Sequence, residues 1–117
     1  MRVMNSEHPV YLATGATDLR ASIDGLSLIV SHVFKLDPFS SAYFVFCNRS
    51  RNKLKILVWE HNGFWLYYKR LEKGCFAWPL SDASPKSISG RELNWILDGL
   101  TLESTRGFRA ERRRKLS

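Results

Sequence analysis

The chain is poor in the residues that hold small proteins together through disulfides or metal ions. Its 117 residues include two cysteines, Cys47 and Cys75, and three histidines, and these residues form no CxxC or HxxxH spacing. Zinc sites use such paired ligands, so we expect no metal and no other cofactor. The cysteines lie far apart in the sequence and are expected to be reduced thiols. A single disulfide between them is the alternative, and nothing in the sequence supports it.

Long apolar segments are also missing. No apolar run approaches the roughly 20 residues that a membrane-spanning helix needs. The first ten residues, MRVMNSEHPV, lack the apolar core of a signal peptide. We therefore expect a cytoplasmic protein with no membrane partner. Hydrophobic residues make up 44% of the chain and aromatic residues 13%, so residues 1–105 are expected to fold as a single domain around one core.

Recognisable catalytic motifs are absent as well. The Asp and Glu residues are scattered over expected helix starts and turns, whereas a two-metal site for phosphoryl transfer needs several converging carboxylates. There is no GxSxG arrangement, as in many hydrolases, and no GxxxxGK[ST] loop, which binds nucleotide phosphates. The sequence thus predicts a protein that is not an enzyme, and it disfavours a small nuclease in particular.

Positive charge is abundant and unevenly distributed. The formal net charge is +7, and residues 106–117 hold six of the 18 Lys and Arg residues but only one of the 11 Asp and Glu residues. This segment is expected to be a flexible basic arm. Such arms commonly bind nucleic acid through its phosphates, whereas the plainer interpretation is a solvated, disordered end.

Residues 43–78 predict an antiparallel meander of about four strands. Four segments have the aromatic and aliphatic composition that favours strands, namely residues 43–47, 54–59, 64–70 and 75–78. Asn62-Gly63 is typical of a tight hairpin turn between the second and third of these segments. A further short strand, residues 10–13, is expected to join an edge of the sheet, and residues 80–87 have the composition of a loop.

Two helices are expected beside this sheet. The first is predicted to begin with Thr17 as its N-cap and to end at the Asp37-Pro38 step. Its apolar face recurs at spacings of three and four, at Leu19, Ile23, Leu26, Val30 and Val33. The second helix begins at a capping box formed by Ser89 and Glu92 and ends at Gly99. Together these elements predict the α+β class, with two helices packed on the meander.

A candidate nucleic-acid site lies where the loop of residues 48–53 meets the end of the strand at residues 64–70. Alternate strand ends of a meander lie at the same edge, so basic residues of both segments should converge. With those of the arm, the candidate phosphate-binding residues are Arg49, Arg51, Lys53, Lys55, Lys69, Arg70, Lys73, Arg109, Arg112, Arg113, Arg114 and Lys115. Trp59, Trp65, Tyr67 and Tyr68 lie nearby on the expected sheet and offer surfaces on which bases could stack, and the first three are also the candidate contacts for a protein partner. The plainer interpretation is that these aromatic residues are core and the charges form a solvated turn.

Several motifs resemble a known family. The most specific are Thr17-Asp18-Leu19-Arg20 with Asp24-Gly25-Leu26, then Asp37-Pro38-Phe39, and the continuous run of residues 44–71. On these residues the chain resembles the TnpB-type accessory protein, the second open reading frame of bacterial insertion sequence family sixty-six. The resemblance covers most of residues 10–100. It implies a bacterial protein that acts beside a separate, larger transposase, which carries the chemistry of DNA cutting and joining.

The resemblance and the convergent charge lead to two hypotheses. The first is a noncatalytic accessory factor for DNA transposition that binds element DNA, the transposase or both. The second is a protein interaction module whose aromatic surface docks on the transposase or on a second copy of the chain, without direct DNA contact. Binding to DNA that weakens steeply with salt would favour the first hypothesis.

Overall fold

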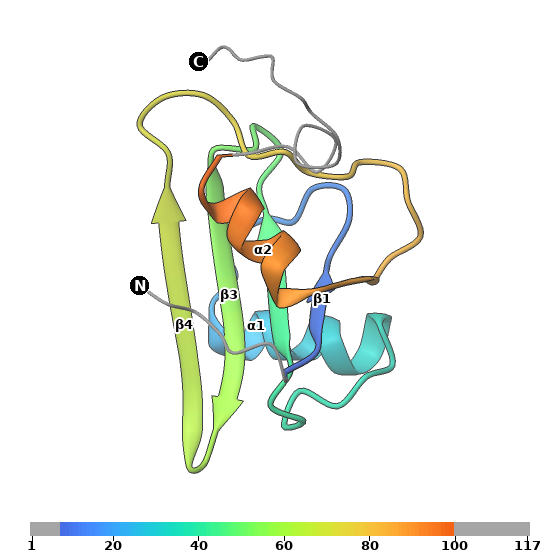
Figure 1. Ribbon diagram of the computed structural model, residues 1–117. Coiled ribbons are helices and arrows are strands. Elements are labelled where there is room, and N and C mark those ends of the chain that lie inside the picture. Colours follow the sequence, from blue (N-terminus) through green and yellow to red (C-terminus); the bar gives the residue numbers. More distant parts are fainter. Residues whose placement is uncertain (1–7, 100–117) are drawn as a thin grey trace.

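The computed structural model describes residues 8–99, which form a mixed five-stranded sheet between two helical layers (Figure 1). The strands are β1 (Val10–Leu12), β2 (Tyr43–Cys47), β3 (Lys53–Glu60), β4 (Gly63–Arg70) and β5 (Lys86–Ile88). Their order in the sheet is β4-β3-β2-β1-β5. The helices are α1 (Ile23–Leu28), continued by the π-helical turn η1 (Ile29–Val33), and α2 (Gly90–Leu97). The predicted α+β class is confirmed.

The meander is confirmed over its first three strands. β2 pairs with β3 and β3 with β4, both antiparallel. The β3–β4 hairpin turns through His61 and Asn62, because Glu60 is paired with Gly63. The turn is therefore centred one residue earlier than the Asn62-Gly63 pattern predicted, with His61 in the left-handed region at a φ of 62°.

Residues 75–78 do not form the predicted fourth strand. The backbone amide of Phe76 donates to the carbonyl oxygen of Arg51 at 2.7 Å. The indole Nε1 of Trp78 donates to the carbonyl oxygens of Ala13 and Gly15, each at 3.1 Å. Both aromatic side chains are buried, so this irregular segment covers one face of the sheet instead of extending it. The composition that favoured a strand reflects this burial, not strand pairing.

The prediction for residues 10–13 is right about the strand and wrong about its place. β1 does not lie at an edge, because it pairs in parallel with β2 and antiparallel with β5. β5 itself begins inside the segment that was predicted to be a loop. A three-residue strand such as β5 is too short to show the alternating pattern by which strands are recognised.

The first helix begins later and ends earlier than predicted. Its N-cap is Ser22, and the amide of Thr17 instead donates to the carbonyl oxygen of Cys47 at 2.8 Å. The Asp18 carboxylate accepts the backbone N–H of Arg20 at 3.0 Å, which closes a local turn that competes with helix formation. The helical segment ends at Val33, before the Asp37-Pro38 step.

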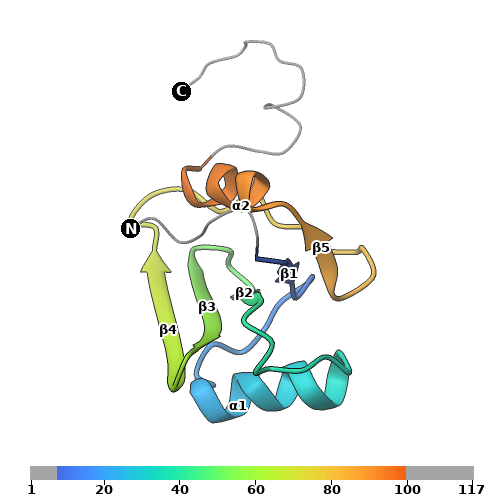
Figure 2. The same cartoon turned by 60° about the horizontal axis from the view of Figure 1, so that its bottom comes forward.

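Both faces of the sheet are covered by the chain itself, as Figure 2 shows for α1 on one side and α2 on the other. Leu26 and Val30 of the first helical layer are buried against β2 and β3, whereas Val33, predicted to share that face, is 67% exposed. Leu93 and Ile96 of α2 pack on the opposite face. The aromatic surface of the meander therefore belongs largely to two cores. Within residues 8–99, no helix has the length and hydropathy required to cross a membrane.

The predicted capping box is confirmed at the start of α2. The Ser89 hydroxyl accepts the backbone N–H of Glu92 at 3.0 Å, and the Glu92 carboxylate accepts the backbone N–H of Ser89 at 2.9 Å. The predicted end of the helix at Gly99 is also confirmed, since this residue adopts a φ of 87° directly after the C-cap Asp98. Two local sequence signals thus determine both ends of α2.

Candidate nucleic-acid interface

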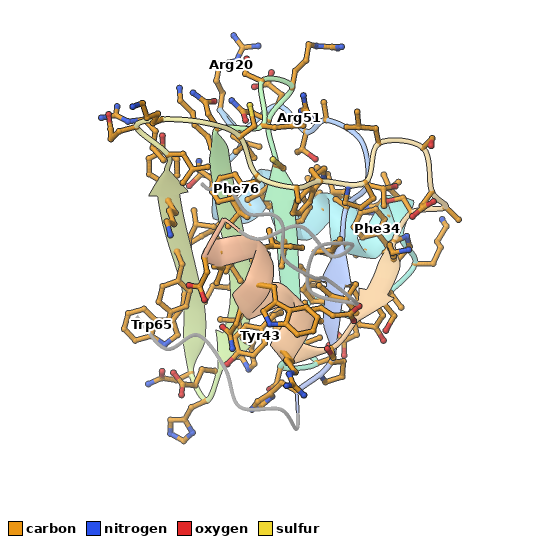
Figure 3. All side chains as sticks on the ribbon, turned by 45° about the horizontal axis from the view of Figure 1, so that its top comes forward. Arg20, Phe34, Tyr43, Arg51, Trp65 and Phe76 are labelled. Carbon is orange, nitrogen blue, oxygen red and sulfur yellow. The ribbon has the colours of Figure 1, made fainter. Side chains whose placement is uncertain are left out.

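The loop after β2 and the end of β4 lie at the same end of the sheet, as predicted. Lys53 is directly opposite Arg70 in the β3–β4 ladder. Figure 3 shows Arg51 at this end and Arg20, from the turn before α1, projecting beyond it. Basic side chains from three separate segments therefore gather at one end of the molecule.

Asn48 shapes the loop that carries these charges. Its side-chain oxygen accepts the backbone N–H groups of Asn52 and Lys53, each at 3.0 Å, and its amide nitrogen donates to the Asn52 side chain at 2.8 Å. Satisfying these groups within the loop leaves Arg49 and Ser50 exposed at its tip. Arg51 is half-buried, and its carbonyl oxygen is used by the amide of Phe76.

A groove of about 920 Å³ opens beside this loop on the α1 side of the sheet. We call it the basic groove. It is bordered by four cationic side chains, one carboxylate and one tyrosine, namely Arg20, Arg49, Lys53, Lys55, Asp18 and Tyr68. An excess of cations in a concave surface raises the local potential and attracts anions.

Lys55 links the groove to the packing of the fold. Its ammonium donates to the carbonyl oxygens of Leu19 and Ala21 at 2.7 and 3.0 Å, and it lies 5.9 Å from the centroid of the Tyr68 ring. These bonds hold the turn before α1 against β3. Because an ammonium has three N–H donors, one remains for another acceptor.

The single carboxylate of the groove is already paired. Arg20 Nη2 lies 2.6 Å from Asp18 Oδ2, and Arg20 Nε donates to both carboxylate oxygens at 3.0 and 3.1 Å. These hydrogen bonds lower the pKa of Asp18 from 3.8 to about 2. The carboxylate is therefore ionised at neutral pH and offsets one of the four cations, so the groove keeps a net positive charge.

The remaining predicted cationic residues within residues 8–99 do not border the basic groove. Lys69 points to the opposite face of the sheet, where its ammonium donates to the carbonyl oxygen of Leu97 at 2.7 Å, at the C-terminus of α2. Arg70 is paired with Glu72 at 2.9 Å, and this hydrogen bond raises the pKa of Arg70. Lys73 is exposed in the loop after β4. The candidates of the arm, Arg109, Arg112, Arg113, Arg114 and Lys115, lie outside the described residues.

The three predicted aromatic partner residues do not share a face. Trp59 packs in T-shaped geometry on Phe39 and Phe64, with centroid distances of 5.0 Å, on the α1 side. Trp65 and Tyr67 stack on each other on the α2 side, with their ring centroids 5.9 Å apart. Figure 3 shows Trp65 at the outer edge of the sheet. Trp65 is 52% exposed. Trp59 is paired with Phe64, and Trp65 is the next residue along β4. Because successive residues of a strand point to opposite faces, the two tryptophans do not meet.

Arg20 and Asp18 border the basic groove but were not among the predicted site residues, whereas Tyr68 was predicted only as a surface for base stacking. The place of Tyr68 in the groove follows from the hairpin register, because it is directly opposite Lys55. Arg20 offered no such signal. It reaches the groove because α1 folds back across the sheet and brings the preceding turn beside the loop after β2.

Comparison with known families gives the same assignment as the sequence motifs. Residues 8–107 match the family model described as IS66 Orf2 like protein. The chain belongs to the IS66 Orf2-like family. It is 38% identical over 91 residues to the uncharacterized protein y4hO of Sinorhizobium fredii, covering 78% of this chain and 79% of that one. It is also 29% identical over 91 residues to y4jC of the same organism, covering 78% of each chain.

No solved structure significantly matches this IS66 Orf2-like chain. The family points to an accessory role in the transposition of an insertion sequence. The basic groove lies within the matched residues, since its members fall between Ala16 and Tyr68. It therefore lies within the matched part of this chain and not in the tail beyond it.

Proposed function

We propose that this IS66 Orf2-like protein is a noncatalytic accessory factor for transposition that binds the DNA of its element through the basic groove. The observation that carries the proposal is the concentration of Arg20, Arg49, Lys53 and Lys55 around one concave surface with a single carboxylate. Arg and Lys side chains supply most contacts to DNA phosphates, and these contacts dominate affinity.

In this proposal, a separate transposase carries out the chemistry of cutting and joining DNA. Two-metal phosphoryl transfer uses several carboxylates aimed at one point, whereas the basic groove contributes only Asp18. That carboxylate is engaged by Arg20. The groove is suited to holding a phosphate backbone, and the proposal gives it no catalytic step.

The test is the salt dependence of binding to duplex DNA from the ends of the element, measured by fluorescence anisotropy. The observed association constant should fall steeply with salt. The double variant Arg49→Ala with Lys53→Ala should lower the slope of log K against log salt by about 2, because each lost phosphate contact contributes about 0.9.

A matched control removes two positive charges far from the groove. Arg91 is exposed on α2, and Lys86 lies on β5 in an ion pair with Asp82 at 2.8 Å. Arg91→Ala with Lys86→Ala changes the net charge equally and should leave the slope almost unchanged. Binding that is absent or independent of salt would contradict the proposal, as would an equal loss of slope in both double variants.

The outer surface of β4 favours a second function, docking of a protein partner. β4 is an edge strand of the sheet, and Trp65 is stacked on Tyr67 while its indole donates to the Glu60 carboxylate at 2.5 Å. Exposed aromatic surface of this kind is typical of protein interfaces. Co-purification with the transposase after nuclease treatment at high salt would support it. Trp65→Ala should then abolish capture, whereas Tyr68→Ala, equally exposed on the other face, should not.

A further inference from the structure

We infer that the basic groove binds single-stranded DNA, with one base stacked on the ring of Tyr68. The inference rests on the proposed DNA-binding function and specifies its ligand. In a duplex the faces of the bases are stacked on one another, and a protein meets mainly phosphates and base edges. A groove that combines cations with an available aromatic ring matches a strand whose bases are free to stack.

The position of Tyr68 supports this reading. It lies on β4 directly opposite Lys55, so its ring is on the α1 side of the sheet, where the basic groove opens. Tyr68 is 54% exposed on the edge strand β4, two residues before this strand ends at Arg70. Among the described residues its ring stacks on no other aromatic ring. The ring is thus carried by a rigid strand and has a face available for a ligand.

The apolar part of the groove points the same way. Leu19 and Leu66 pack against the core on the α1 side but remain only half-buried, so each leaves apolar surface at the border of the groove. A nucleobase stacked on Tyr68 would bury part of this remaining apolar surface. The sugar-phosphate backbone on either side of that base would meet the cations.

Those cations come from separate segments around the ring. Arg20 belongs to the turn before α1, Arg49 to the tip of the loop after β2, and Lys53 to the start of β3. Lys55 adds its remaining N–H donor next to the Tyr68 ring. A flexible single strand can follow cations arranged around an aromatic ring, whereas a stiff duplex cannot bend around one residue.

The experiment compares one fluorescein-labelled strand of the element-end DNA with the same strand annealed to its complement, by anisotropy over the same series of salt concentrations. The full chain should bind the single strand more tightly than the duplex. Tyr68→Ala should weaken single-strand binding about 5- to 150-fold, the range that loss of one base–aromatic stack produces. Tyr68→Phe, which keeps the ring, should bind as the unaltered protein does. Duplex affinity should not change in either variant.

Other outcomes overturn the inference and separate its failure from that of the proposed function. If the duplex binds with a normal salt slope and the single strand binds no better, the inference is wrong and the proposed function stands. If Tyr68→Ala weakens both ligands equally, or Tyr68→Phe is as damaging, stacking is not the cause and the inference is also wrong. If neither ligand binds, both proposals fail. A thermal unfolding curve for each variant shows whether the fold is intact.

Discussion

The ammonium of Lys55 lies 2.7 Å from the carbonyl oxygen of Leu19, and this contact joins the candidate site to the fold. The same side chain borders the basic groove and ties the turn before α1 to β3. A change at Lys55 therefore alters stability and charge together. For this reason the binding tests use Arg49 and Lys53, whose side chains are not tied to that turn in the same way.

Replacing Lys55 by methionine should destabilise the fold. Lys55→Met keeps the aliphatic length but removes both hydrogen bonds to the carbonyl oxygens of Leu19 and Ala21. A hydrogen bond from a charged donor contributes about 1.5–3 kcal/mol, and these carbonyls can partly rehydrate, so we expect the free energy of unfolding to fall by about 2 kcal/mol. Urea unfolding measures this free energy. Lys53→Met is the control and should lower the free energy of unfolding much less. Equal urea midpoints for the two variants would contradict the structural role of Lys55.

The titration of Asp18 should depend on Arg20. Hydrogen bonds from Arg20 hold the pKa of Asp18 at about 2, below its ordinary 3.8. Because the folded pKa is lower than the unfolded one, this pair stabilises the fold fully above about pH 4, and its contribution disappears as the pH falls towards 2. In Arg20→Ala the pKa should return towards 3.8. The pKa of Asp18 can be measured by NMR from its carboxyl chemical shift as a function of pH. An unchanged pKa in the variant would show that another group lowers it.

Removing the N-cap side chain of α2 should measurably lower the free energy of unfolding. Ser89→Ala deletes the hydroxyl that accepts the Glu92 amide at 3.0 Å. Loss of an N-cap side chain typically destabilises a protein by about 1 kcal/mol. Chemical unfolding of Ser89→Ala should show this loss. Ser87→Ala, an exposed serine on β5, should remain close to the unaltered protein, and a comparable loss there would mean that the cap is not the cause.

The two cysteines should differ sharply in reactivity. Both are free thiols, as predicted, but Cys47 is buried in β2 and Cys75 is exposed. Burial raises the pKa of Cys47 to about 12, so its thiolate is scarce at pH 8. Native protein should release one equivalent of thionitrobenzoate rapidly from an aromatic disulfide reagent, and denatured protein two. Cys75→Ser should abolish the fast reaction. Two fast equivalents in the folded protein would show that Cys47 is accessible.

Much of the candidate site follows from the antiparallel topology that the sequence predicts. The loop after β2 and the end of β4 had to meet once three successive strands formed a meander, and Lys53 is indeed opposite Arg70. Lys55 is paired with Tyr68, and Lys69 is the next residue along β4. Because successive strand residues point to opposite faces, Lys69 and Lys55 lie on different faces of the sheet. On sequence alone, these lysines group together by their charge and by the edge of the sheet that their segments share. Lys55 donates to carbonyl oxygens of the turn before α1, whereas Lys69 donates to one at the end of α2, so the two lysines have distinct structural roles.

The sequence by itself determined β2, β3, β4, their hairpin and both ends of α2, because these depend on local composition, turn residues and a capping box. Only the tertiary structure decided where the short or irregular segments lie. Residues 75–78 have strand-like composition but are used to cover a core, and β5 gains its strand conformation only by pairing with β1. Arg20 likewise joins the basic groove through the packing of α1. Such placements depend on contacts between residues far apart in the chain, which no local pattern records.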